Sequence, residues 1–417
     1  VKRDDICPEE DKSFWDTVVK HGLDLGDIIG CTGFAFITKT GETSIHAQTI
    51  TLLTKSLKPL PVVKRDEEGN VFDAVTDPEF RYRQRYADLI INPNVKDTFV
   101  KRTKIINTIR DFLNSQGAVE VDTPVLQAIP GGAAARPFIT HHNALDVPFY
   151  LRIANELYLK RLIVGGFDWV YEFSRNFRNE GLSRRHNPEF TMLEAYWAYA
   201  DFEKMADLVE GMICHLAENF CGGLKIEHKD DEGNVTKTIN LARPWKRARY
   251  TDLLKSIDPK WYDYTPEQRK ARAQELGVEI GANFEDYEVT QHVFERLIEA
   301  KQFDPLYVTH CPKELVPLAK QNADDDSIVD VYELVINGQE ISPGYSELNN
   351  PIVQRERLEH QAGEETQKID EEFILALEHG MPPAGGIGIG IDRLIMMLTG
   401  AESIRDVILF PQLKRKE

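Results

Sequence analysis

An arginine, a glutamate and a phenylalanine lie around one expected turn and together could bind a nucleotide. Arg178 and Glu180 follow one stretch of alternating residues, and Phe190 lies on the next stretch. A guanidinium can hold phosphate oxygens, a carboxylate can accept from an exocyclic amine, and an aromatic ring can stack on a base. A hairpin with a solvated, charged turn fits the same residues, because charged loop tips are ordinary. A second segment of the chain is needed to choose between a nucleotide-binding turn and a solvated, charged turn.

Two strands are expected to position these groups, at residues 170–178 and 189–196. In the first strand, period-two alternation puts aromatic side chains on one face and polar side chains on the other. In the second strand, the same period places Phe190, Glu194 and Tyr196 on one side. We expect one face to pack in a core and the other face to carry the chemistry.

A glycine-rich segment at 385–398 supplies a second cation. Glycine and isoleucine alternate before Arg393, and an apolar run follows it. The pattern predicts a strand with one bare face, where a flat group can lie, and then a buried helix. Arg393 would lie at the N-terminus of that helix, where spare N–H groups and the dipole favour anions. A dinucleotide fingerprint is excluded, because the spacing is G-x-G-x-G and no βαβ unit follows.

Two glutamates on one expected hairpin could hold divalent cations. Asn337-Gly338 is a strong signal for a two-residue type I′ turn, which pairs Val335 with Glu340. Glu333 and Glu340 then share one face as diagonal neighbours, about 7–8 Å apart. Carboxylates at this spacing can share hard cations such as Mg²⁺ that also bind phosphate oxygens. An exposed acidic edge that discourages aggregation is the alternative interpretation.

Taken together, these segments resemble the class II aminoacyl-tRNA synthetases of the aspartate/asparagine/lysine subgroup, and most closely the lysyl-tRNA synthetases. The three class II motifs correspond to residues 99–116 with the strand ending at Pro124, residues 178–196 and residues 386–398. Segments of the lysyl type are found at 80–89, 131–138 and 403–411. The resemblance extends from about Asp27 to the C-terminus, which makes a chance match of motifs a poor explanation.

The resemblance implies an α+β fold, in which a class II synthetase antiparallel sheet flanked by helices is preceded by a partial OB-fold β-barrel. The implied parts are an anticodon-binding unit at 1–61, a linker at 62–76 and a catalytic domain at 77–417 with an insertion at about 222–310. Strands are expected at 26–37 and 44–47 of the first unit. Two strands and a helix cannot close a five-stranded barrel, so we expect the strands that read the anticodon to be absent.

The resemblance also implies a role for each candidate residue. A substrate carboxylate attacks the α-phosphorus of ATP, and a tRNA terminal ribose then takes the aminoacyl group. The implied catalytic residues are Arg178 and Arg393. The implied ATP-binding residues are Arg178, Glu180, His186, Asn187, Phe190, Glu333, Gly390 and Arg393. The implied lysine-binding residues are Gly132, Glu156, Arg178, Tyr196, Tyr345 and Glu347, and the implied Mg²⁺ ligands are Glu333 and Glu340.

One position departs from the family pattern and leads to a geometric prediction. Pro343 stands where the family usually has asparagine, and Tyr345 stands where it often has phenylalanine. Strict alternation from Glu340 would point Tyr345 and Glu347 away from the site. Proline lacks a ladder donor and glycine permits positive φ, so we expect a break in strand pairing at Pro343-Gly344 that turns both side chains inward.

Composition limits the other properties of the chain. The formal charge of -18 over 417 residues argues against non-specific nucleic-acid binding, although it does not exclude a tRNA partner. The five cysteines show no C-x-x-C spacing and fit a reducing cytoplasm without structural zinc or disulfides. No run of eighteen apolar residues and no signal peptide is seen, so we expect a cytoplasmic protein with no membrane partner.

Two functions are compatible with these residues. The first is ATP-dependent activation of L-lysine and its transfer to the 3′ end of tRNA(Lys), by a homodimer formed through motif 1, at about 99–124. The second is a paralogue that ligates lysine or a related amino acid to another acceptor, or a regulatory lysine-binding module that charges nothing. The incomplete OB unit favours the second, and the acidic amino-acid pocket is compatible with both.

Overall fold

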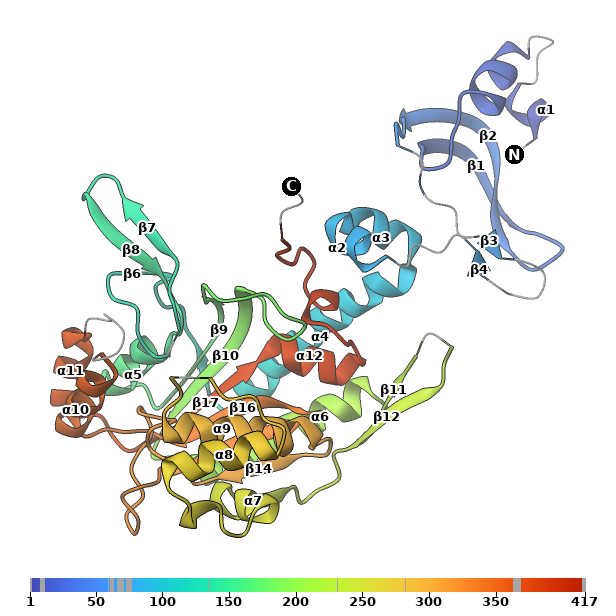
Figure 1. The fold of residues 1–417 in the computed structure, drawn as a ribbon. Helices are drawn as coiled ribbons and strands as arrows, with labels where there is room; N and C mark the ends of the chain where they lie inside the picture. Colours follow the sequence, from blue (N-terminus) through green and yellow to red (C-terminus); the bar gives the residue numbers. More distant parts are fainter. Residues whose placement is uncertain are drawn as a thin grey trace. The chain divides into compact units, whose positions relative to one another are not determined.

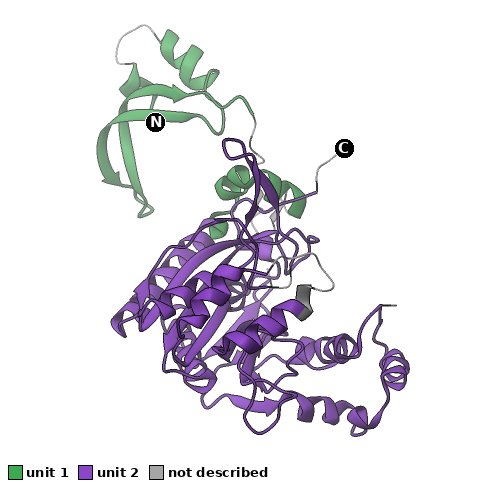
Figure 2. Ribbon diagram, turned by 90° about the vertical axis from the view of Figure 1, so that its left-hand side faces the viewer, with its two compact units in different colours: residues 1–95 green, residues 96–417 purple. Residues whose placement is uncertain are grey.

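The chain folds into two compact units, residues 1–95 and 96–417 (Figure 2). The computed structural model describes residues 2–7, 12–58, 60, 64–65, 71–72, 77–133, 135–230, 232–281, 283–362 and 369–414. None of the helices described in these ranges is long and apolar enough to cross a membrane.

The first unit is built on a long antiparallel pair of strands, β1 (Ile28–Ile37) and β2 (Thr43–Thr54). Its other elements are α1 (Arg3–Ile6), a π-helix (Trp15–Lys20), β3 (Lys64–Arg65), β4 (Val71–Phe72), α2 (Pro78–Arg83) and α3 (Arg85–Ile91). Both predicted strands are present, and the second is longer than predicted. Most of the predicted linker, 62–76, lies outside the described residues, and its described part is the antiparallel pair of β3 and β4.

A buried carboxylate joins α2 to α3 in a segment of the lysyl type. Asp88 is fully buried, and its two oxygens lie 2.6 Å from Arg85 Nη1 and 2.9 Å from Arg81 Nε. Asn92 Nδ2 donates to the same carboxylate at 2.7 Å. Because buried charges are stable only when paired and hydrogen-bonded, this network gives the charged residues of 80–89 a structural role.

The second unit is built on an eight-stranded sheet of order β13-β14-β15-β16-β17-β10-β9-β5 (Figure 1). Neighbouring strands pair antiparallel, except that β13 and β5 run parallel to their neighbours at the two edges. The strands are β5 (Val119–Glu120), β9 (Trp169–Phe177), β10 (Glu189–Ala198), β13 (Lys246–Arg249), β14 (Leu306–Thr309), β15 (Val331–Ile336), β16 (Gln339–Ser346) and β17 (Ala384–Gly390). The predicted α+β class, with an antiparallel sheet flanked by helices, is confirmed.

Helices cover one face of this sheet fully and the other face at its two ends. One face packs on α4 (Pro93–Ser115), α6 (Phe202–Phe220) and α12 (Ile391–Thr399), and the α4 residues Ile105, Ile109 and Leu113 are fully buried there. On the other face, α7 (Tyr250–Ile257), α8 (Pro266–Glu275) and α9 (Asp286–Leu297) form one group. The second group is α5 (Glu156–Val164), α10 (Pro351–Ala362) and α11 (Glu371–Glu378).

The predicted insertion, about 222–310, is partly built into the sheet. It begins with a hairpin of β11 (Lys225–Lys229) and β12 (Val235–Asn240). It then supplies β13 and β14 as well as the helices α7, α8 and α9. A further three-stranded sheet contains β6 (Leu126–Gln127), β7 (Ile139–His142) and β8 (Val147–Leu151). Short 3-10 helices lie at Trp261–Asp263, Glu299–Lys301 and Ile404–Asp406.

The β15–β16 hairpin has the predicted turn and the predicted starting register. Asn337 and Gly338 have φ values of 60° and 72°, as a type I′ turn requires, and Val335 pairs with Glu340. The predicted break at Pro343-Gly344 is wrong, because Glu333 pairs with Pro343 and Tyr332 with Gly344 without interruption.

The register shift lies earlier in the hairpin, at Ile341. Val335 pairs with Glu340 and Leu334 with Ser342, which leaves Ile341 as the extra residue, and its side chain packs in the core. Pairing of β16 with β17 begins at Gly344, so at Pro343 the strand β16 is paired on one side only. A proline is tolerated at such a position, because no backbone N–H is needed on the unpaired side. Tyr345 still lines one cavity with Glu340 and Pro343, as predicted, whereas Glu347 is buried beside Lys160 and is not among the residues that line this cavity.

Removing the buried carboxylate of α3 should cost far more stability than removing an exposed one. Asp88→Ala leaves the Arg85 guanidinium buried without its carboxylate, so we expect the free energy of unfolding to fall by about 3 kcal/mol. Glu79→Ala removes a partly exposed ion pair with Arg83 from the same helix pair and should cost less than about 1 kcal/mol. Denaturant unfolding of both variants measures the difference, and equal losses would contradict a structural role for Asp88.

Candidate active site

A cavity of about 1720 Å³ opens over the sheet between the two helix groups. Predicted residues from distant parts of the chain line it together: Gly132, Glu156, Arg178, Glu180, Glu333, Glu340, Pro343 and Tyr345. Helix α9 adds Glu288 and Glu295, and its N-cap adds Glu285. The cavity therefore joins the expected phosphate-binding, metal-binding and amino-acid-binding groups.

Arg178 and Phe190 face each other across the β9–β10 pair, in the geometry expected for phosphate and base. The guanidinium carbon of Arg178 lies 5.3 Å from the centre of the Phe190 ring. Arg178 N donates to Pro188 O at 2.9 Å, which closes the loop between the strands. Arg178 Nε is buried and has no hydrogen-bond partner among the described residues, so this cation retains an unused donor.

Arg393 is held at the first turn of α12 by two groups from other elements. Its Nη1 donates to Glu340 O at 3.1 Å, and its Nη2 lies 3.2 Å from His186 Nε2. Burial, and then the charge of Arg393, lowers the pKa of His186 below its ordinary value, so this imidazole is neutral near pH 7. His186 Nδ1 lies 2.8 Å from Ser183 Oγ, a contact that leaves Nε2 to accept from Arg393.

Asn187 and Gly390 serve the local structure of the same loop and helix. The Asn187 amide donates to Glu189 O at 2.6 Å, and its oxygen accepts from Gln412 N at 3.2 Å. Gly390 is the N-cap of α12, and a side chain there would meet the Arg393 side chain at 3.7 Å. Both residues position the loop and the cation, whereas a direct contact with ATP stays a prediction for each.

A buried ion network connects α4 to the two nucleotide-facing elements. Arg102 Nη1 lies 2.6 Å from Asp392 Oδ1, and Arg102 Nη2 donates to Thr191 Oγ1 at 3.1 Å. Asp392 Oδ2 accepts from Thr191 N at 2.8 Å. Because Asp392 and Thr191 adjoin Arg393 and Phe190 in sequence, the network fixes the expected phosphate ligand and stacking ring relative to each other.

Glu333 and Glu340 provide the kind of site that a nucleotide-bound cation fits. Burial, and then the charge of Glu340, raises the pKa of Glu333 to about 8. Burial and the same charge raise the pKa of Glu299 to about 7, and Glu340 N donates to this third acid at 3.3 Å. Among the described residues, no group of three or more His, Cys, Asp or Glu side chains forms a protein metal cage. Two repelling carboxylates open to a cavity instead suit Mg²⁺ that takes its other ligands from phosphate and water.

The expected lysine ligands surround a buried lysine of the chain itself. Lys160 is fully buried, and its Nζ lies 2.7 Å from Glu156 Oε1 and 2.5 Å from Glu347 Oε2. Glu156 lies in the first turn of α5, and Glu347 follows β16. Glu347 Oε1 is buried without a hydrogen-bond partner among the described residues. The pocket therefore presents an unused carboxylate oxygen.

Two tyrosines and another acid complete this pocket. Tyr196 OH donates to Glu194 Oε2 at 3.2 Å, and both side chains are buried. Burial, and then the charge of Glu156, raises the pKa of Glu194 to about 8. Burial, and then the charges of Glu156 and Glu347, raise the pKa of Tyr345 above its ordinary value. Three carboxyl groups and one ammonium thus share a buried space, which favours a cationic ligand.

The sequence prediction missed Lys160 and Glu194 as members of this pocket. Both had a sequence signal, since Lys160 is four residues after Glu156 on one helix and Glu194 is two residues before Tyr196 on one strand. Glu299 had no such signal, because only the tertiary fold places its short helix beside β16.

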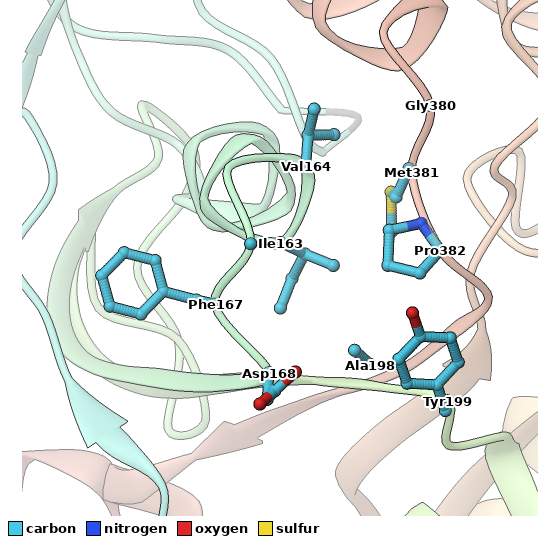
Figure 3. Close-up of a pocket in the computed structure, with 10 residues that line it drawn as sticks. Ile163, Val164, Phe167, Asp168, Ala198, Tyr199, Gly380, Met381 and Pro382 are labelled. Carbon is cyan, nitrogen blue, oxygen red and sulfur yellow. The ribbon is translucent and has the colours of Figure 1, made fainter.

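A smaller hollow, of about 420 Å³, lies at the opposite end of the β9–β10 pair from Arg178 (Figure 3). Phe167, Asp168 and Tyr199 line it from the strand side, and Met381 and Pro382 line it from the chain that precedes β17. No residue that lines this hollow in the structure is cationic, and none is a predicted site residue. None of the residues that line this hollow therefore belongs to the chemistry expected from the sequence.

Comparison with known proteins agrees with this geometry. Residues 77–414 match the family model described as tRNA synthetases class II (D, K and N). The chain belongs to this family. It is 50% identical over 423 residues to a lysine–tRNA ligase of Porphyromonas gingivalis, a match that covers 99% of the chain and 72% of the relative. It is 48% identical to a lysine–tRNA ligase of Christiangramia forsetii, with 99% of the chain and 73% of the relative covered.

A third relative, a lysine–tRNA ligase of Azobacteroides pseudotrichonymphae, is 46% identical over 421 residues, which cover 99% of the chain and 83% of the relative. The recognition of the lysyl-type synthetases from motifs is confirmed. The family match covers the catalytic motifs and the segment 80–89, whereas residues before 77 are matched by the relatives alone.

A methyl group on Gly386 should damage the amino-acid pocket selectively. A Cβ at this position would lie 1.9 Å from Glu347 Oε1 and 2.7 Å from the Tyr196 ring. Gly386→Ala should therefore weaken lysine binding about tenfold or more, since overpacking costs 1–3 kcal/mol. Gly388→Ala on the same strand is the control, because its Cβ would meet the flexible end of Met192 at 3.2 Å. Lysine titrations by calorimetry test this, and equal binding by both variants would contradict the pocket.

Proposed function

We propose that the chain activates L-lysine with ATP to lysyl-adenylate and transfers the lysyl group to the 3′ end of tRNA(Lys). The observation that carries the proposal is the cavity that joins Arg178 and the acids Glu333 and Glu340 to Glu156 and Tyr345 of the acidic pocket. An aspartyl pocket would need cations facing the ligand side chain. Here Glu347 and its neighbours offer carboxyl groups, which suit an ammonium.

The reaction brings a carboxylate to a triphosphate, so like-charge repulsion is the main barrier that the site has to overcome. Arg178 binds the α-phosphate together with the substrate carboxylate, and Arg393 binds the γ-phosphate. Glu180 accepts from the adenine amine and Phe190 stacks on the base. No general base is needed, because the attacking carboxylate is ionised near neutral pH. Mg²⁺, held by Glu333 and Glu340 through the nucleotide, would neutralise phosphate charge.

The amino acid lies between this phosphate region and the acidic pocket. Glu156 binds its α-ammonium beside Gly132, whose φ of 88° turns the backbone close to Glu156. Glu347 and Tyr196 bind the ε-ammonium, and Tyr345 packs along the methylene groups. At position 343, proline cannot supply the amide of the family's usual asparagine, so the pocket orients lysine without that hydrogen bond.

The same proposal includes a homodimer formed through residues 99–124 and a cytoplasmic location. The edge strand β5 and the chain after it expose apolar side chains, including Val119, Val125 and Leu126. An exposed apolar edge of this kind is expected where a second subunit packs.

The alternative function, ligation of lysine to another acceptor, shares the adenylation site and differs only in the acceptor.

ATP–pyrophosphate exchange tests the adenylation step. We expect exchange with lysine and none with aspartate or asparagine. Arg178→Ala should remove about 3 kcal/mol or more of transition-state stabilisation, as for loss of one preorganised electrostatic donor. Arg175→Ala is the matched control, because this arginine lies three residues earlier, on β9, with its side chain 50% exposed.

Exchange with aspartate or asparagine but not lysine would overturn the substrate. Full activity of Arg178→Ala would remove this residue from its role. Charging of a tRNA(Lys) transcript distinguishes the two acceptors, since exchange without charging would favour the alternative function.

A further inference from the structure

The floor of the amino-acid pocket contains a cation that the reaction itself does not use. Lys160 lies four residues after Glu156 on α5 and is fully buried. Its ammonium group contacts Glu156, Glu347 and, at 3.4 Å, the Leu318 carbonyl. An ammonium has three donors, and the structure surrounds this one with three acceptors. Lys160 is thus fixed in place and has no donor left for a ligand.

This contact fixes the two acids at one separation. Glu156 is attached to a helix and Glu347 to the chain after β16, and Lys160 Nζ is within 2.7 Å of both carboxylates. Each acid meets the ammonium with one oxygen. The second oxygen of Glu347, Oε1, points to the place where a Gly386 side chain would lie and has no partner within the described chain. The lysine therefore orients the Glu347 carboxylate, with Oε2 toward α5 and Oε1 toward Gly386 of β17.

We propose that Lys160 is a specificity-determining positioning residue, which holds the Glu156 and Glu347 carboxylates in one fixed arrangement and offsets their negative charge in a buried pocket. The inference rests on the proposed function. Without Lys160, the pocket would contain three buried carboxyl groups and no cation, and proteins relieve such a charge excess by protonation.

The charged groups around Glu347 show in which direction its ionisation would change. Lys160 and Glu156 face it from α5, Glu194 and Tyr196 face it from β10, and Tyr345 lies two residues before it, on β16. Burial raises the pKa of Glu347 to about 8, and Glu156 and Glu194 contribute to the rise, whereas the Lys160 ammonium opposes it. Among the strongest influences on Glu347 from the described residues, Lys160 is the opposing charge, so its removal shifts the acid toward the protonated form. A protonated Glu347 cannot form an ion pair with the substrate.

The test measures the KM for lysine in ATP–pyrophosphate exchange at several pH values, for the wild type and Lys160→Met. Wild-type exchange with lysine comes first, because it establishes the proposed function independently of this inference. At pH 7 we expect Lys160→Met to raise the KM for lysine about tenfold for each unit by which the substitution raises the pKa of Glu347. The defect should shrink as the pH rises, and the KM for ATP should stay nearly unchanged.

Two further variants separate charge from packing. Lys160→Gln keeps a polar group that can donate to both acids, and it should show the same pH-dependent defect because it lacks the charge. Arg161→Met removes the next cation of α5, which pairs with Asp370 at 2.5 Å and not with the pocket acids. Its lysine KM should show no new pH dependence. A Lys160→Gln enzyme with the wild-type KM at every pH, or a Lys160→Met defect that is equal at every pH, would overturn the inference.

Discussion

The one-residue register shift in the β15–β16 hairpin is the constraint on which the site depends. Glu340 precedes the shift and faces the cavity. Without the register shift, Tyr345 would face the core. The extra residue, Ile341, is 1% exposed and packs in the core. Burying this side chain stabilises the bulge, and the bulge turns Pro343 and Tyr345 to the cavity side. A single apolar residue thus aligns the metal-facing part of the strand with the amino-acid pocket.

The remaining site groups are held by buried polar contacts between elements that are distant in sequence. Asp392 connects α4 to β10 through Arg102 and Thr191. Lys160 connects α5 to the chain after β16. Buried networks of this type are costly when one member is lost, because the others remain desolvated. Because each network is held by several buried contacts, its members stay fixed before a ligand binds. The ligand therefore meets charges that are already in position.

The sequence predicted the elements whose pattern is local. Alternation predicted β9, β10 and β17, and the apolar run after Arg393 predicted α12. The Asn337-Gly338 turn predicted the hairpin register, because positive φ at both residues allows few other geometries. The position of the bulge was predicted wrongly. Pro343 lies where β16 is paired on one side only, and the sequence does not show which part of a strand is paired on one side. Contacts between distant segments, such as Glu299 beside Glu340, have no local signal.

The roles assigned to the site residues come from family motifs, and the structure adds the charges around them. The central claim is that the acidic pocket recognises the side-chain ammonium of a diamino acid. Calorimetric titration of the chain with L-lysine and with L-norleucine tests it most directly, because the two ligands have the same backbone and carbon chain and differ in the terminal ammonium. Lysine should bind at least about a hundredfold more tightly, as expected when a buried carboxylate loses its charged partner. Equal binding of the two ligands would contradict the account.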